Sequence, residues 1–175
     1  DHFYVYGNAV RIAADFDLNG PGFTSWRGQS ASGGGGPQWY ATGPFRYAAL
    51  SLDGQTSDKV TLYAYLNSVY ESGFANPIDE AVREYCCPDI TGWRKVDEVP
   101  YDFIRKRLSV LAAQNGNHLM ITKGALKNVL EACSTAELGS GKVVPLDAAQ
   151  GEIQRNFAQF SQQGLRTLGI ASRAL

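Results

Sequence analysis

Three consecutive basic residues stand directly before a segment that predicts a buried strand. They are Arg105, Lys106 and Arg107. They lie within VPYDFIRKRLSV at 99–110, where strand alternation directs Leu108 and Val110 to one face and Ser109 to the other. The basic run is therefore either a solvated, charged strand end or a site that attracts an anion, and its residues alone leave both interpretations open.

Two further basic residues stand where a predicted strand begins or ends. In TKGAL at 122–126, Lys123 and Gly124 follow an apolar strand and precede a predicted helix. A glycine there lets a ligand approach the backbone, and a helix start offers free N–H groups to an anion; the alternative is a plain turn glycine. The spacing is not that of a P-loop. Arg166, in GLRTLGIASR at 164–173, is the second such residue, and its simpler interpretation is an exposed strand residue.

The composition limits the classes of protein that these residues can serve. The 175 residues carry a formal charge of −1, which argues against general nucleic-acid binding. No apolar run approaches about 18 residues, so we expect no membrane span in this sequence. Three cysteines, two of them adjacent, form a poor disulfide framework and indicate reduced thiols in a cytosolic compartment. Only His2 and His118 are available as histidine bases, and the sequence shows no recognisable nucleophile–base set, which disfavours a hydrolase acting alone.

The elements that must position the basic residues start near residue 45. The sequence predicts a strand over 45–52, a helix capped by Ser57 that extends to about residue 70, and a short helix that begins at Pro77. A Gly-rich segment at 139–147 predicts a loop.

Strands joined by hairpins dominate the second half of the chain. The predicted strands are 94–99, 107–113, 118–122 and 165–171. The predicted helices are 124–133 and 148–163. Asn115-Gly116 predicts a tight hairpin turn, and helical spacing directs Ile153, Phe157 and Phe160 to one face. This order favours an α+β fold in which an antiparallel sheet is flanked by helices.

The composition changes near residue 45, which predicts a boundary between an unassigned extension or insertion at 1–44 and a domain at 45–175. The leading segment contains GGGGP at 33–37, which is typical of a loop or linker. Before it, FYVYGNAVRIAADF at 3–16 predicts one or two strands, with Gly7-Asn8 as a turn.

Two other features of the leading segment admit a binding role. DFDLNG at 15–20 resembles the start of a calcium loop, but the twelfth position is Trp26 rather than glutamate, which argues against calcium. Trp26, Trp39 and Tyr40 form either a protein- or glycan-binding surface or a small packed flap.

Three segments, in this order and spacing, resemble the nucleotide-binding domain of P-type ATPases. They are VDEVPYDFIRKRLSV, HLMITKGALKNVLEACS and GLRTLGIASR. LNSVYESGFANPIDEAV at 66–82 is most similar to the magnesium-transporting branch of that superfamily. The resemblance covers about residues 50–175 and implies ATP as the ligand.

The resemblance implies roles for residues in the first of these segments. Tyr101 corresponds to an aromatic residue that stacks on adenine, where phenylalanine is usual, and tyrosine keeps the π face that stacking needs. Phe103 stands two residues further along the predicted strand, as a core residue or a wall of the pocket. Lys106 corresponds to a lysine near the base and the phosphates.

The other segments supply the remaining candidate residues. By resemblance, Lys123 lines the floor of the pocket, Gly124 lets adenine lie against the backbone, and Arg166 reaches the phosphates. Calcium and sodium pumps carry a glutamate at the position of Asn76, so adenine contact there is expected to be uncharged. Asp79 is a nearby carboxylate whose expected role is to stabilise the start of its helix.

The family phosphorylates an aspartate in a D-K-T-G-T sequence, which does not occur here. The resemblance therefore implies a chain without catalytic residues that holds ATP, with its accompanying magnesium, for transfer to an aspartate in a separate domain. We expect no tight metal site in this chain. The implied partners are the phosphorylation and membrane domains of a plasma-membrane transporter, beside which this piece is a monomeric cytoplasmic domain without direct membrane contact. The alternative is a non-enzymatic protein- or glycan-binding module that uses the aromatic N-terminal segment.

Overall fold

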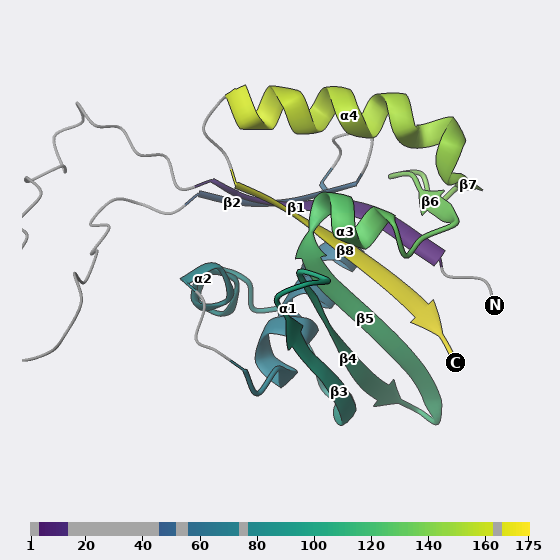
Figure 1. Ribbon diagram of the computed structural model, residues 1–175. Helices are drawn as coiled ribbons and strands as arrows, with labels where there is room; N and C mark the ends of the chain where they lie inside the picture. The colour runs from purple at the N-terminus through teal and green to yellow at the C-terminus, as the bar shows by residue number, and fades with distance from the viewer. Residues whose placement is uncertain (1–3, 14–45, 52–55, 74–76, 163–165) are drawn as a thin grey trace, which may run out of the picture.

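The chain forms an α+β fold in which one mostly antiparallel sheet carries helices on both faces (Figure 1). The computed structural model describes residues 4–13, 46–51, 56–73, 77–162 and 166–175. The strands are β1 (Tyr4–Ala13), β2 (Arg46–Ser51), β3 (Arg94–Asp102), β4 (Arg107–Gln114), β5 (Asn117–Ala125), β6 (Thr135–Glu137), β7 (Val143–Pro145) and β8 (Arg166–Ala174). The helices are α1 (Asp58–Tyr70), α2 (Pro77–Tyr85), α3 (Leu126–Leu130) and α4 (Leu146–Gln162).

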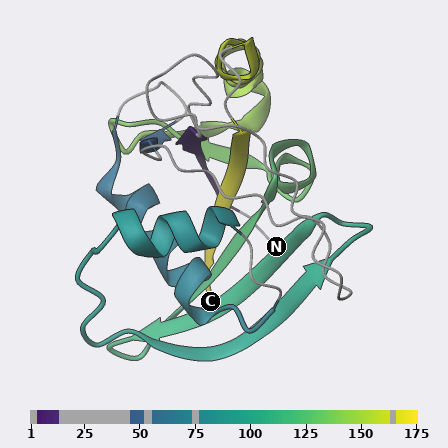
Figure 2. The same ribbon diagram turned by 90° about the vertical axis from the view of Figure 1, so that its left-hand side faces the viewer.

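The sheet runs in the order β3-β4-β5-β8-β1-β6-β7, and β2 also pairs with β1, at residues 8–13. Every pairing is antiparallel except the short one between β1 and β6. The predicted fold class, an antiparallel sheet flanked by helices, is confirmed. Figure 2 shows α1 and α2 on one face of the sheet and α3 and α4 on the other.

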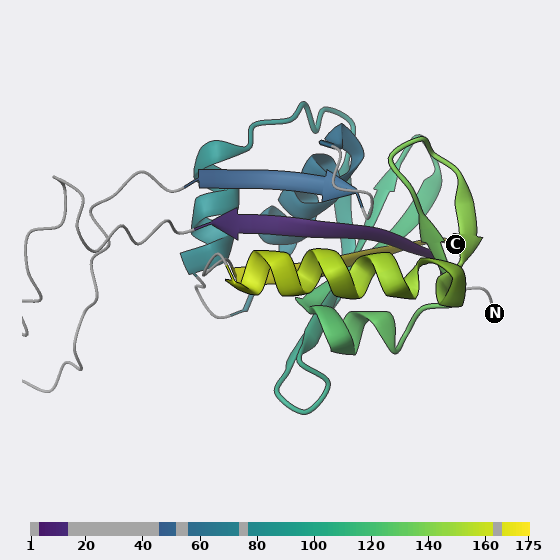
Figure 3. The ribbon, with the colours of Figure 1, turned by 90° about the horizontal axis from the view of Figure 1, so that it is seen from above.

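The larger core lies between the sheet and the pair α1 and α2. Its fully buried side chains include Val60, Leu66, Val82, Ile121 and Ile170. A smaller core joins α3, α4 and β6 on the other face. In Figure 3, α4 runs alongside β1 above the sheet. We call the face that carries α1 and α2 the helix-pair face.

Several local predictions are confirmed. Ser57 is the N-cap of α1, since its side chain accepts a hydrogen bond from the Val60 amide. Helix α2 begins at Pro77, as expected for a residue without an amide hydrogen. Asn115 and Gly116 both have positive φ, which is the conformation of a tight hairpin turn between β4 and β5.

Other local predictions are wrong. Gly7-Asn8 is not a turn: β1 is one strand, and the glycine coincides with an irregularity in its pairing with β8. The predicted loop at 139–147 forms part of the β6–β7 hairpin, whose strands have only three residues each. The expected helix over 124–133 is only the five-residue α3.

The apolar face of α4 is narrower than its sequence predicts. Ile153 and Phe160 are buried as expected, but Phe157, which stands between them in the sequence, is 39% exposed.

The boundary predicted at residue 44 stays a prediction. Strand β1 comes from the leading segment and pairs with β2, β6 and β8 within the same sheet. The aromatic residues of that segment, Trp26, Trp39 and Tyr40, lie outside the described residues.

Candidate functional site

Four neighbouring strands place the candidate residues at one end of the sheet. Asp102 of β3 pairs with Arg107 of β4, Arg107 pairs with Gly124 of β5, and Gly124 pairs with Gly169 of β8. Tyr101, Lys106 and Lys123 each stand one residue from this row. Segments more than 60 residues apart in sequence therefore meet at the same sheet end.

The connection between β3 and β4 is a tight turn built on the carboxylate of Asp102. Its Oδ1 accepts hydrogen bonds from the amides of Ile104 and Arg105 at 2.7 and 2.9 Å, and Oδ2 accepts one from Arg105 Nε at 2.8 Å. These bonds, the Arg105 amide first, lower the pKa of Asp102 to about 2. Lys106 completes the turn with φ of 50°. The turn thus fixes where the basic run points.

Phe103 lies in this turn and not on a strand, so the strand spacing assumed for it is wrong. Its side chain is 82% exposed, which excludes the core role. The ring makes an edge-to-face contact with Tyr101, with centroids 5.2 Å apart and an interplanar angle of 85°. Tyr101 is 43% exposed and so presents part of its ring to solvent.

Gly124 is required by the protein's own backbone. A Cβ atom at Gly124 would collide with the carbonyl oxygen of Lys106 and stand 2.7 Å from Cα of Arg107. That carbonyl accepts a hydrogen bond from the Ala125 amide at 3.0 Å, which draws the turn against β5. On the side of Gly124 where a Cβ atom would stand, the β3–β4 turn therefore occupies the space that was expected for a ligand. Contact of its backbone with adenine stays a prediction.

Lys123 projects to the helix-pair face and is almost completely buried, with 3% exposure. Its Nζ pairs with Asp79 of α2, donates to Ser68 Oγ of α1 at 3.1 Å and reaches Glu71 Oε2 at 3.5 Å. Asp79 also accepts a hydrogen bond from Ser68 Oγ at 2.8 Å. We call Ser68, Glu71, Asp79 and Lys123 the lysine cluster.

The pKa values of the two carboxyl groups in the lysine cluster are shifted in opposite directions. Burial, with a hydrogen bond to Asp79, raises the pKa of Glu71 to about 7. Burial also opposes ionisation of Asp79, but the charge of Lys123 and hydrogen bonds from its neighbours outweigh it and lower the pKa of that carboxyl. Well below pH 7 the carboxyl group of Glu71 is therefore neutral, while the carboxylate of Asp79 pairs with Lys123.

The remaining candidate residues, Asp79, Arg166 and Asn76, differ in how far the structure defines their positions. Asp79 stands in the first turn of α2, as expected, but its burial and its pair with Lys123 were not foreseen. Arg166 begins β8 and is exposed; alternation puts it on the same face as Leu168 and Ile170, which is the helix-pair face. Asn76 lies outside the described residues.

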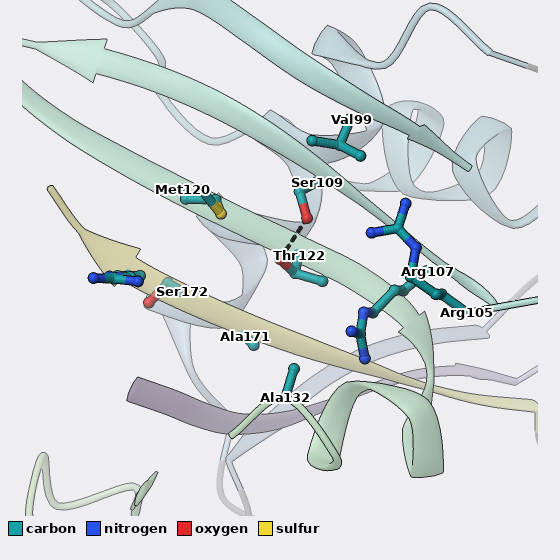
Figure 4. A pocket seen from close by; sticks show the side chains of 10 residues that line it. Val99, Arg105, Arg107, Ser109, Met120, Thr122, Ala132, Ala171 and Ser172 are labelled. Atoms are coloured by element: carbon teal, nitrogen blue, oxygen red, sulfur yellow. Dashed lines mark hydrogen bonds between the residues drawn. The ribbon is translucent and has the colours of Figure 1, made fainter. Parts of the chain in front are cut away.

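A groove lies on the opposite face of the same strands (Figure 4). It has a volume of about 210 Å³, and the residues that line it include Arg105, Arg107, Thr122 and Arg173. Arg107 Nη1 donates to the carbonyl oxygen of Asn128 in α3. Since Thr122 and Lys123 are consecutive on β5, the groove and the lysine cluster are separated by the sheet.

Sequence reasoning missed Glu71 and Ser68. Their spacing of three residues places both on one side of α1, inside the LNSVYE segment that carried the family resemblance. That spacing is the signal in the sequence that could have identified these two partners of Lys123.

In the described ranges no group of three or more His, Cys, Asp or Glu residues is arranged to hold a metal ion. Within those same residues, no helix has the length and apolar character needed to cross a membrane.

Comparison with known proteins gives consistent matches. A family model described as "P-type ATPase, cytoplasmic domain N" matches residues 68–175. The magnesium-transporting ATPase, P-type 1, of Escherichia coli (strain K12) is 37% identical over 131 residues, which cover 71% of this chain and 14% of that protein. The protein of the same name from Salmonella typhimurium (strain 14028s) is 36% identical over 131 residues, with the same coverage.

A calcium-transporting relative matches over a shorter length. The calcium-transporting ATPase 2, endoplasmic reticulum-type, of Arabidopsis thaliana is 36% identical over 80 residues, which cover 45% of this chain and 8% of that protein. The chain thus spans only a small part of the curated relatives that it matches, about one seventh of the magnesium-transporting ones.

Proposed function

The chain belongs to the family of P-type ATPase cytoplasmic N domains, and from this we propose that it binds ATP for a cation-transporting P-type ATPase. The single observation that best supports this is the meeting of Tyr101, Lys106 and Lys123 at one end of adjacent strands. An aromatic face, an exposed ammonium and a buried ammonium at one place match the needs of a base attached to phosphates.

Each residue has a distinct role in this proposal. Tyr101 stacks on adenine through the part of its ring that is open to solvent. Lys123 forms the floor of the site on the helix-pair face, and Arg166, on the same face of β8, approaches the phosphates. Lys106 lies between base and phosphates, and Phe103 forms a wall of the site. Asn76, which precedes Pro77 in the sequence, is the proposed uncharged adenine contact.

The reaction itself belongs to the parent protein. We propose that this chain holds ATP while an aspartate of a separate phosphorylation domain accepts the γ-phosphate. The accompanying Mg²⁺ is held mainly by the phosphates and by that domain, as its preference for oxygen ligands and retained waters suggests. Magnesium is the proposed transported ion, because the relatives covering most of this chain are named magnesium-transporting ATPases.

The same proposal places the chain in an assembly. Its partners are the phosphorylation and membrane domains of the parent transporter, and it lies on the cytoplasmic side of the plasma membrane as a monomeric module.

Titration with ATP, followed by amide NMR, tests ATP binding. We expect shifts at Tyr101, Lys106, Lys123 and Arg166, smaller but similar ones with AMP at the residues around the base, and little change when Mg²⁺ is omitted. Tyr101→Ala should weaken binding about tenfold, since stacking on a base is worth roughly 1–3 kcal/mol, whereas Tyr101→Phe keeps the ring and should bind normally. If ATP at millimolar concentration shifts none of these amides, the proposed function is wrong.

A further inference from the structure

The ammonium group of Lys123 has no hydrogen left for a ligand. An ammonium offers three N–H donors, and Nζ has three acceptors within 3.5 Å, on Ser68, Asp79 and Glu71. Any ligand atom that accepts a hydrogen bond from Lys123 must therefore replace one of these three partners.

The three partners are not equally fixed. Asp79 is 1% exposed and also bonded to Ser68, so both stay together when Lys123 moves. Glu71 is at 3.5 Å, the longest of the three contacts, and its side chain is 9% exposed. It is also the residue at which α1 ends, with φ and ψ outside the helical region. Glu71 is therefore the partner that is easiest to displace.

Glu71 also has other charged groups around it. From α2 these are Asp79 and Arg83, whose Nη1 donates to the Ser68 carbonyl oxygen at 2.6 Å. From β3 it is Glu98, which accepts a hydrogen bond from the amide of Ser72 at 2.9 Å and pairs with Lys95. Strand β5 contributes Lys123. The residues of β4 and β8 that face the helix pair at this level, such as Val110 and Ile170, are apolar.

We propose that Glu71 is an internal competitor for Lys123: its carboxylate holds the ammonium position that an acceptor atom of the bound nucleotide must take. This inference rests on the proposed function. Asp79 acts as the positioning residue that keeps Lys123 on the helix-pair face while the exchange occurs. Because Asp79 cancels the charge of Lys123, the exchanged contact suits an uncharged acceptor of the base or sugar, and the phosphates depend on Lys106 and Arg166.

The test compares nucleotide affinity in Glu71→Gln and in the unaltered chain by calorimetric titration with ATP. Removal of the competing charge should tighten binding about three- to tenfold, the size of the net contribution of one ordinary hydrogen bond. In a Lys123→Met background, Glu71→Gln should leave the ATP affinity equal to that of Lys123→Met alone, because the ammonium for which Glu71 competes is absent. Glu84→Gln, which removes an exposed carboxylate from α2, is the matched control and should not tighten binding.

The pH profile separates competition from a purely structural role. Affinity of the unaltered chain should rise as pH falls through about 7, where Glu71 takes up a proton. Glu71→Gln should remove that rise, and the ionisation of ATP itself is common to both proteins. An amide spectrum of each variant checks whether its fold is intact, and only folded variants are compared.

The outcomes distinguish the two proposals. Tighter binding by Glu71→Gln that depends on Lys123 supports the competition. Normal ATP binding by the unaltered chain, with equal or weaker binding by a folded Glu71→Gln variant, overturns the competition and leaves the proposed function standing. Absence of ATP binding in every variant overturns both.

Discussion

The lysine cluster and the β3–β4 turn each hold a candidate lysine, and they begin one residue apart on paired strands, but the two lysines have opposite environments. Lys123 is 3% exposed and surrounded by acceptors, whereas Phe103 and Ile104 at the tip of the turn are 82% and 89% exposed. The turn keeps its cations in solvent, where they attract anions over a distance that salt limits. In the lysine cluster, the ammonium of Lys123 is neutralised by its partners and is held in one position by its contacts with them. The comparison teaches that a basic residue beside a nucleotide site need not contribute charge to it.

Substitution of Lys123 should have the largest effect on stability. Lys123→Met leaves Asp79 buried without its cation, and breaking a buried pair in this way costs about 3–5 kcal/mol of unfolding free energy. Urea denaturation measures the loss. The double variant Lys123→Met/Asp79→Asn should recover much of it, because the uncompensated charge is gone. Equal loss in the single and double variants would mean that packing, and not charge, governs this region.

Gly124 lies between the two regions, and its substitution should have the second-largest effect on stability. Gly124→Ala forces the Lys106 carbonyl and Arg107 away from β5, an overpacking that costs about 1–3 kcal/mol. Thermal unfolding measures the change. Gly151→Ala is the matched control: that glycine lies inside α4 with nothing within 4 Å of the added carbon, and the change should stabilise the chain by about 0.5–1 kcal/mol. A neutral Gly124→Ala would show that the turn can move freely.

Glu71 makes the buried region sensitive to pH. Its pKa is about 7 in the folded chain against 4.5 ordinarily, so the folded state binds the proton more tightly. The contribution of this group to stability is full below about pH 4.5 and is lost as pH rises towards 7. Urea denaturation of Glu71→Gln across this range should show a flatter profile than that of the unaltered chain. Glu84→Gln should keep the original slope; an unchanged slope in Glu71→Gln would contradict the assigned pKa.

Asp102 should give the smallest effect on stability, since its ion pair with Arg105 is solvent-exposed. Because its pKa is lowered to about 2, its contribution to stability is present above pH 3.8 and is lost as pH falls towards 2. Solvent screening keeps that contribution small, so Asp102→Asn should leave thermal unfolding at pH 7 almost unchanged, while it broadens or shifts the amide signals of Ile104 and Arg105. A large fall in melting temperature would mean that the turn supports the core.

Local signals in the sequence were sufficient to predict many of the helices, strands and turns. The cap at Ser57, the hairpin at Asn115-Gly116 and the inward alternation of Leu108 and Val110 depend on neighbouring residues alone, and each is confirmed. The β6–β7 hairpin was missed because three-residue strands give too few alternating positions to be distinguished from a loop.

The chemistry around the candidate residues could not be predicted in the same way. Lys123 and Glu71 are 52 residues apart, and their contact exists only because α1 packs on β5. Phe103 was assigned to a strand because the sequence does not reveal that Asp102 closes a turn on the next two amides. The crowding at Gly124 likewise depends on where that turn comes to rest.

The most direct measurement of nucleotide binding over Lys123 is methyl NMR of the two faces of the sheet during titration with ATP. Leu108 and Leu168 report on the helix-pair face, while Met120 and Val99 report on the groove. If the nucleotide binds over Lys123, the two leucine methyl groups should shift with a common saturation curve and the groove methyl groups should not. Shifts confined to Met120 and Val99 would place the nucleotide on the other face, among the arginines, and would contradict the proposed site.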